Sequence, residues 1–262
     1  MPTNTFKNIL SQAMRRNNFS VMAKKVVKRL VDSQGQHSQA ENLAWLKQHC
    51  CSFEELAANL DADLWQDAQR VSQRLEDHAN QVLNHIEYDL GGGGAYPFLY
   101  YVTRYLNPSV ILETGVAAGF SSYAFLTALK QNQHGKLYSS DFPYFRLPNP
   151  EKYVGVVVEE DLKENWRLYL DGDEANLPQI LAAVNTVDIF HYDSDKSYSG
   201  RDFALSLVSP YLSQKALIIM DDIQDNSYFY DYVERTNPAE WYVFDFKGKY
   251  VGVIGRLKNT ES

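Results

Sequence analysis

The stretch Val110–Ser122 (VILETGVAAGFSS) constrains the fold more than any other part of the chain. Its apolar start leads into Glu113, and small residues then alternate at Gly115, Ala117 and Gly119. A buried strand, a tight loop and the start of a helix account for this order, because small residues permit positive φ and the close approach of a ligand. Backbone N–H groups at such a helix start point toward whatever lies above the loop. The pattern therefore predicts a loop that binds a nucleotide-like cofactor.

Short apolar runs alternate with helical segments from Val110 onward, which is typical of a parallel sheet. The expected strands are Val110–Glu113, Lys136–Ser140, Arg167–Leu170, Val187–His191 and Ala216–Met220, followed by a hairpin of Trp241–Phe246 and Tyr250–Gly255. We therefore expect an α/β fold with a Rossmann-like, seven-stranded, mostly parallel sheet, a C-terminal antiparallel hairpin and an N-terminal helical region.

Four consecutive glycines, Gly91–Gly94, divide the chain. Residues 1–90 have helical periodicity, and we expect them to form a helical cap or dimerisation region. Residues 91–262 would form the α/β domain. The glycine run is either a flexible linker between the two parts or a hinge that lets the backbone pass close to a ligand. The two interpretations are compatible.

Charge is distributed unevenly along the 262 residues, whose net charge is −8. Residues 1–31 hold seven Lys or Arg and no acid, so the rest of the chain is strongly acidic. An acidic body argues against nucleic acid as a partner. The basic arm is either a solvated helix face, a contact to an acidic partner subunit, or a contact to a membrane or polyanion.

The distribution of cysteines and apolar residues bears on where the protein works. Cys50 and Cys51 are adjacent, which disfavours a disulfide between them and gives no zinc-ligand spacing. No apolar run approaches the length of about 18 residues that a membrane-spanning helix needs. We therefore expect no membrane span and a reducing, cytoplasmic environment.

Acidic residues follow nearly every expected strand of the sheet. They are Glu113, Asp141, Asp173, Asp193, Asp221 and Asp222. Ligands of open parallel sheets bind beyond the carboxyl ends of the strands, where these side chains would gather. An Asp at one such end can simply cap the next helix, but six favour a site for hydroxyl or cationic groups. Asp141, at the end of the second strand, stands where an acid accepts hydrogen bonds from a ribose diol.

Five motifs in order along residues 91–256 resemble those of the class I S-adenosylmethionine (SAM)-dependent methyltransferases. The chain is most similar to the family that contains metal-dependent O-methyltransferases of sugars and small molecules in natural-product pathways. The motifs are VILETGVAAGFSS, LYSSDFP, LDGDEANLP, VDIFHYDSDKSY and LIIMDDI. The resemblance implies SAM as the cofactor, with Asp141 at the ribose and Asp173 near the adenine. The remaining residues expected to bind or shape the cofactor pocket are Glu113, Gly115, Ala117, Gly119 and Ser121.

The resemblance also implies that Asp193, Asp221 and Asp222 hold Mg²⁺. Three carboxylates on neighbouring strand ends repel one another unless a cation or protons intervene, and oxygen ligands suit Mg²⁺. The alternative is a metal-free edge in which one Asp caps a helix and another contacts SAM. Lys196 stands where related proteins often have His. Asp193, Asp195 and Lys196 are therefore the candidates for accepting or steering the acceptor's proton.

The resulting prediction is a methyltransferase that transfers the methyl group of SAM to a hydroxyl of a small molecule, such as a sugar or natural-product intermediate. A homodimer is the expected assembly. The alternatives are an N-methyltransferase or hydroxylase-like enzyme, a non-catalytic SAM-binding partner, and an NAD-dependent oxidoreductase, which the loop pattern disfavours.

Overall fold

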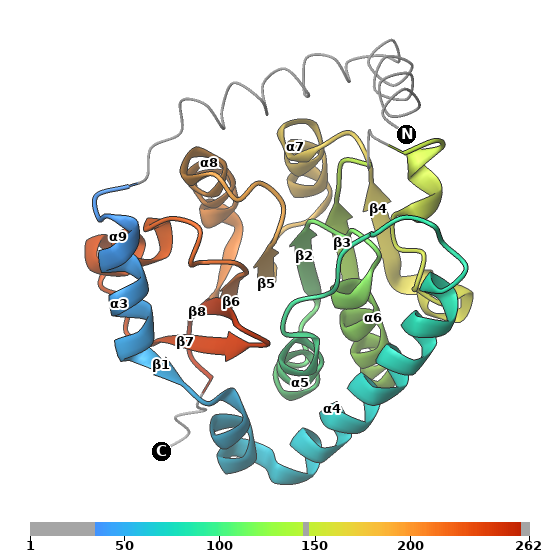
Figure 1. Cartoon of the computed structure of the whole chain (residues 1–262), viewed down its shortest axis with the longest axis horizontal. Coiled ribbons are helices and arrows are strands. Elements are labelled where there is room, and N and C mark those ends of the chain that lie inside the picture. Colours follow the sequence, from blue (N-terminus) through green and yellow to red (C-terminus); the bar gives the residue numbers. More distant parts are fainter. Residues whose placement is uncertain (1–34, 144–146, 258–262) are drawn as a thin grey trace.

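The computed structural model describes residues 35–143 and 147–257 and contains one central twisted sheet (Figure 1). The basic arm of residues 1–31 lies outside the described residues, as do residues 144–146. Eight strands are ordered β1-β7-β8-β6-β5-β2-β3-β4 in the sheet. Their bounds are β1 Cys50–Cys51, β2 Val110–Thr114, β3 Lys136–Ser140, β4 Trp166–Tyr169, β5 Val187–Tyr192, β6 Leu212–Met220, β7 Trp241–Phe246 and β8 Lys249–Ile254.

Among the strands of the described residues, only β8 runs antiparallel to its neighbours. It pairs with β6 on one side and with β7 on the other, whereas the remaining pairs are parallel. The Rossmann-like sheet with a C-terminal antiparallel hairpin is therefore confirmed. The sheet has eight strands where seven were expected, because the two-residue strand β1 pairs with β7 at the edge, with Cys50 opposite Val243. Two residues carry no readable alternation, so the sequence gives no signal for this strand.

Helices cover both faces of the sheet. They are α3 Gln39–His49, α4 Phe53–Leu83, α5 Tyr96–Leu106, α6 Phe120–Asn132, α7 Asp173–Ala183, α8 Tyr198–Val208 and α9 Tyr228–Thr236, with short 3₁₀ turns at Pro150–Tyr153, Glu160–Asn165 and Ser209–Tyr211. Successive strand residues face opposite sides, so Ile111 packs with α4, α5 and α6 while Leu112 packs with α7 and α8. The result is a three-layer arrangement with the sheet in the middle.

The N-terminal helices pack on the α/β body. Helix α4 is bent at Asp61, where φ is −158°, and the Asp61 carboxylate accepts a hydrogen bond from the Leu64 N–H and so begins the second half of the helix. Trp65 and Leu75 of α4 are buried in the same apolar cluster as Phe98 and Phe125 of the body. The described part of residues 1–90 thus shares its core with the sheet, while a separate domain and a dimer role stay predictions.

No helix among the described residues is long and apolar enough to cross a membrane.

Candidate active site

The predicted cofactor loop connects β2 to α6, and three of its residues have positive φ. The φ values are 81° at Gly115, 50° at Ala117 and 103° at Gly119. A Cβ atom on Gly115 would lie 2.4 Å from the carbonyl oxygen of Asp193, and one on Gly119 would lie 2.8 Å from Cα of Gly155. The alternation of small residues is therefore required by the turn and by close backbone neighbours. Binding of the cofactor by these residues remains a prediction.

Glu113 lies beneath this loop and is completely buried. Its carboxylate accepts hydrogen bonds of 2.6 Å from the hydroxyls of Ser121, Ser122 and Ser139. The indole N–H of Trp166, which can only donate, bonds to the Ser139 hydroxyl at 2.9 Å, so the Ser139 proton must go to Glu113. The hydrogen bond between Glu113 and Ser121 thus ties the first turn of α6 to the end of β2. Nothing in the sequence pattern connects Ser139 and Trp166 with this loop.

Asp141 follows β3 and faces the same loop. One carboxylate oxygen accepts N–H groups of Val116 at 3.0 Å and Ala117 at 2.8 Å, and the other accepts the N–H of Phe142 at 2.6 Å. Burial raises the pKa of Asp141 to about 6, even though these three donors favour the charged form. The acid expected at the ribose therefore lies directly beside the loop expected to hold the cofactor.

Asp173, the acid expected near the adenine, begins α7 and lies beside the ends of β3 and β5. Its carboxylate accepts a hydrogen bond of 2.6 Å from the Ser140 hydroxyl and another from the Ser194 hydroxyl. The buried Asn176 donates to the Ser140 hydroxyl and to the carbonyl oxygen of Tyr169. Asp173 is thus held firmly at the strand ends, close enough to Asp141 for the two charges to interact.

Lys196 lies between the ends of β5 and β6. Its ammonium group bonds to the carboxylate of Asp193 and lies 3.0 Å from that of Asp222, whose other oxygen is 3.2 Å from Nζ of Lys249. Burial lowers the pKa of Lys196, while the charge of Asp222 opposes this change. Burial alone would raise the pKa of Asp222, but Lys196 and the Gln224 amide lower it to about 2. Three of the predicted catalytic or metal residues therefore meet here.

The predicted Mg²⁺ triad is not supported by this geometry. No group of three His, Cys, Asp or Glu side chains in residues 35–143 and 147–257 is arranged to hold a metal ion. The charged amine of Lys196 stands between Asp193 and Asp222, where a cation would have to sit. Asp221 is almost fully buried, and a Cβ on Gly94 would lie only 1.8 Å from its Oδ2. The residues do not fit a divalent metal in this arrangement.

Asp195, the third catalytic candidate, points to the start of α8. Its carboxylate accepts the N–H of Ser197 at 3.1 Å, and a Cβ on Gly200 would lie 2.5 Å from its Cγ. The side-chain hydroxyl of Ser197 caps the same helix by accepting the N–H of Gly200. The Asp195 carboxylate therefore lies at the N-terminus of α8 and is not part of the Lys196 cluster, which is Lys196 with Asp193 and Asp222.

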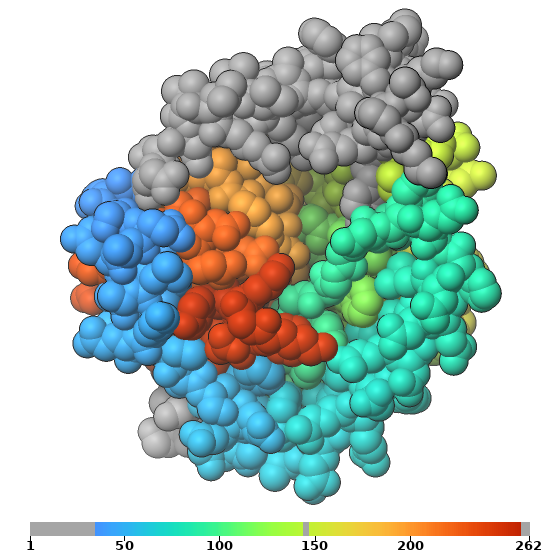
Figure 2. All heavy atoms as spheres, viewed as in Figure 1, coloured from blue at the N-terminus to red at the C-terminus, as the bar shows by residue number. Residues whose placement is uncertain are grey.

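The glycine run Gly91–Gly94 passes over the strand ends. A Cβ on Gly93 would lie 2.1 Å from that of Phe120, in addition to the contact of Gly94 with Asp221. Figure 2 shows the β7–β8 hairpin, in red, reaching across this face toward α4, in teal. Lys247 at the hairpin tip bonds to Glu76 of α4 at 2.9 Å and to the Tyr96 hydroxyl at 2.7 Å. The second half of the run is thus a close-fitting strap, whereas Gly91 and Gly92 have open space around them.

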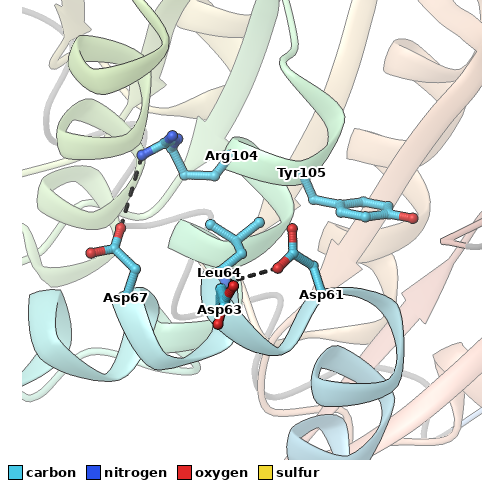
Figure 3. A pocket seen from close by; sticks show the side chains of 6 residues that line it. All are labelled: Asp61, Asp63, Leu64, Asp67, Arg104 and Tyr105. Carbon is cyan, nitrogen blue, oxygen red and sulfur yellow. Dashed lines mark hydrogen bonds and ion pairs between the residues drawn. The ribbon is translucent and has the colours of Figure 1, made fainter.

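A separate cavity of 480 Å³ lies between the bend of α4 and the last turn of α5 (Figure 3). Asp61, Asp63, Leu64, Asp67, Arg104 and Tyr105 line it. Arg104 and Tyr105 shortly precede β2, so this cavity lies toward the amino end of that strand. It is therefore at the opposite edge of the sheet from the acids described above.

The comparison with known proteins agrees with this geometry. Residues 112–223 match the model of a family described as a methyltransferase domain. No curated protein matches the chain. The prediction of a methyltransferase domain is confirmed for residues 112–223.

Solved methyltransferase structures have a similar fold at low sequence identity. The O-methyltransferase of tomaymycin synthesis from Streptomyces achromogenes, in complex with SAM, has 13% identity and a TM-score of 0.53, over 69% of this chain and 88% of that chain. A Podospora anserina methyltransferase bound to S-adenosylhomocysteine (SAH) has 11% identity and a TM-score of 0.53, over 77% and 96%. A Bacillus cereus O-methyltransferase in complex with SAH has 12% identity and a TM-score of 0.52, over 80% and 100%.

Proposed function

We propose that this chain, whose residues 112–223 match a methyltransferase-domain family, transfers the methyl group of SAM to a hydroxyl oxygen of a small molecule. The observation that carries the proposal is the placement of two sites on one sheet edge. The Gly115–Gly119 loop and Asp141 form a cradle at β2 and β3, and Lys196 with Asp193 stands at β5. The first would hold the cofactor and the second the acceptor.

Lys196 would take the proton in this reaction. Its lowered pKa makes the neutral amine more accessible, and Asp193 and Asp222 hold the amine in place. The acceptor oxygen would lose its proton to Nζ and bond to the methyl carbon while the bond between that carbon and sulfur breaks. The products are a methyl ether, SAH and an ammonium group on Lys196, which the two carboxylates stabilise. The chain's main task is to align the two reactants and exclude water.

No step is assigned to Mg²⁺, because the Lys196 amine fills the gap between Asp193 and Asp222. A divalent ion would need that amine to leave, since two cations cannot share the gap. In the proposed mechanism, the positive charge that Lys196 gains with the proton, and not that of a metal ion, lies beside the acceptor oxygen.

The proposed acceptor is a sugar or natural-product intermediate that carries a free hydroxyl. The Streptomyces achromogenes relative, which is involved in tomaymycin synthesis, supports a natural product as one such acceptor. We retain a cytoplasmic location and a homodimer as parts of the proposal.

Titration calorimetry with SAH and with NAD⁺ is the first test. We expect SAH to bind and NAD⁺ not to bind, and failure of SAH at millimolar concentration would refute the proposal. Transfer of a labelled methyl group from SAM to a panel of phenols, catechols, sugars and amines then identifies the acceptor atom. Transfer to amines alone favours an N-methyltransferase, and SAH binding without transfer to any acceptor favours a non-catalytic partner.

A further inference from the structure

Arg201 of α8 is one of the largest fully buried side chains in the described part of the chain. Its Nη2 donates hydrogen bonds to two consecutive carbonyl oxygens, those of Asp221 at 3.0 Å and Asp222 at 2.9 Å. Its Nε and Nη1 atoms have no hydrogen-bond partner within the described part of the chain. One nitrogen of the guanidinium therefore makes both polar contacts, and both are to the turn after β6.

Stability does not explain why a guanidinium occupies this position. Removing a guanidinium from water is costly, and two of its nitrogen atoms recover no hydrogen bond here. Its Cζ lies 5.9 Å from the centre of the Tyr192 ring, but a cation–π contact offsets only part of the desolvation. The neighbouring residues on the same face of α8 are Ala204, Leu205 and Val208, which are buried and apolar. An aliphatic side chain of similar length would fill the same space without the desolvation penalty.

The turn that Arg201 contacts has an unusual backbone. Asp222 has φ of 51°, in the left-handed region that non-glycine residues rarely adopt. This conformation aims the Asp222 carboxylate at Nζ of Lys196, 3.0 Å away. Because one nitrogen bonds to both carbonyl oxygens, neither of the two consecutive peptide units that carry them can rotate without breaking a hydrogen bond. The guanidinium is thus bonded to the backbone of the residue that holds Lys196.

We infer that Arg201 is a positioning residue that fixes the Asp221–Asp222 turn and, through the Asp222 carboxylate, the place of the Lys196 amine. The inference rests on the proposed function only where it assigns Lys196 to the reaction. We call these contacts, from Arg201 to the carbonyl oxygens of Asp221 and Asp222 and from the Asp222 carboxylate to Lys196, the clamp. The clamp joins three described segments: α8, the turn after β6, and the loop after β5.

Competitive acetylation with acetic anhydride tests the clamp without an acceptor or cofactor. The rate at Lys196 is measured by peptide mass spectrometry, relative to that of the exposed Lys136 in the same sample. Three variants are compared with the native chain: Arg201→Met, Arg201→Lys and, as a matched control, Arg104→Met. Arg104 is a partly buried arginine on α5, and its side chain bonds to Tyr100 and Gln131.

Arg201→Met should release the turn and so weaken the ion pair between Asp222 and Lys196, which should raise the relative rate at Lys196 about fivefold. Arg201→Lys separates this effect from the loss of the Arg201 charge, which by itself would raise the pKa of Lys196 and slow acetylation. Arg201→Lys keeps one donor and should give an intermediate rate, while Arg104→Met should match the native chain. An unchanged rate in Arg201→Met, an equal rise in Arg104→Met, or no rescue by Arg201→Lys would overturn the inference. If circular dichroism shows that Arg201→Met does not fold, an unchanged rate in Arg201→Lys overturns it instead.

A kinetic measurement separates this inference from the proposed function. With an acceptor that the native chain methylates, Arg201→Met should keep the Kd for SAH and lose about tenfold or more in kcat, as misplaced catalytic groups do. Equal losses in SAH binding and kcat would indicate general damage and overturn the inference. If the native chain transfers no methyl group at all, the proposed function fails, and the acetylation rates still decide whether Arg201 positions Lys196.

Discussion

The raised pKa of Asp141 leads to a quantitative prediction for the variant Asp141→Asn. An ordinary aspartate has a pKa of 3.8, whereas burial raises that of Asp141 to about 6. Between these values the folded chain binds a proton that the unfolded chain has released, so stability falls as the pH rises. The full gap corresponds to about 3 kcal/mol, an upper limit because the side chain is partly exposed. About 2 kcal/mol of it falls between pH 4.5 and 7.5.

Urea unfolding of the native chain and of Asp141→Asn at a series of pH values measures this effect. Asparagine does not titrate, so the difference in unfolding free energy between the two proteins should shift by about 2 kcal/mol in favour of the variant from pH 4.5 to 7.5. Loss of hydrogen bonds to Val116 and Ala117 changes the difference by a constant and leaves the slope intact. Asp188→Asn is a suitable control, because that carboxylate also accepts two backbone N–H groups.

A difference that stays flat within about 0.5 kcal/mol over this range would refute the reasoning about burial. The same variant tests the ribose assignment. Asp141→Asn should weaken SAH binding about tenfold, the cost of losing a charged hydrogen-bond acceptor. Unchanged binding with a clear pH slope would separate the two roles, since the carboxylate would then be buried beside the loop without touching the ligand.

Three further predictions concern the Lys196 cluster and the strap. Lys196→Met should lower kcat about 10²-fold or more, and Lys196→Arg should not restore it because a guanidinium stays charged; activity of Lys196→Arg within threefold of native would show that charge alone suffices. Dialysis against EDTA should leave methyl transfer unchanged. If EDTA abolished activity and added Mg²⁺ restored it, a metal ion would displace the Lys196 amine from between Asp193 and Asp222. Gly94→Ala should reduce activity and stability relative to Gly92→Ala, because a Cβ at residue 94 would meet Asp221 and one at residue 92 would meet nothing. Urea unfolding and methyl-transfer assays measure both effects, and equal behaviour of the two variants would contradict the close fit at Gly94.

The sequence predicted the sheet well because each strand is a local signal. Apolar runs bounded by turn residues need no knowledge of their partners, and parallel connections place their carboxyl ends at one edge. Lys136–Ser140 was predicted with its observed bounds, and Asp141 was expected at its end. The loop with Gly115 and Gly119 was likewise readable, because positive φ restricts the residue types that can occupy it.

Contacts between distant segments could not be read in the same way. The metal site expected at Asp193, Asp221 and Asp222 followed from the family resemblance and from three carboxylates on neighbouring strand ends. The spacing of three residues allows Lys196 to pair with Asp193, but nothing local indicated that it would also reach Asp222. Arg201 did leave a signal. It shares a helical face with the apolar residues Ala204, Leu205 and Val208, and a charged residue on a buried face calls for an explanation.

Strand β1 has a consequence for how the chain reaches its native state. Cys51 contacts Val243 across a separation of 192 residues, so the pairing of β1 with β7 closes a loop that contains nearly the whole α/β body. Contacts of such long range form late, after the strands between them have assembled. Until then β7 is an open edge with unpaired backbone groups, the kind of surface on which chains pair with one another. The segment before α4 therefore also covers the edge of the sheet, and a chain shortened beyond Cys51 should aggregate, although Leu46 is the one buried apolar residue that it loses from the described part of the chain.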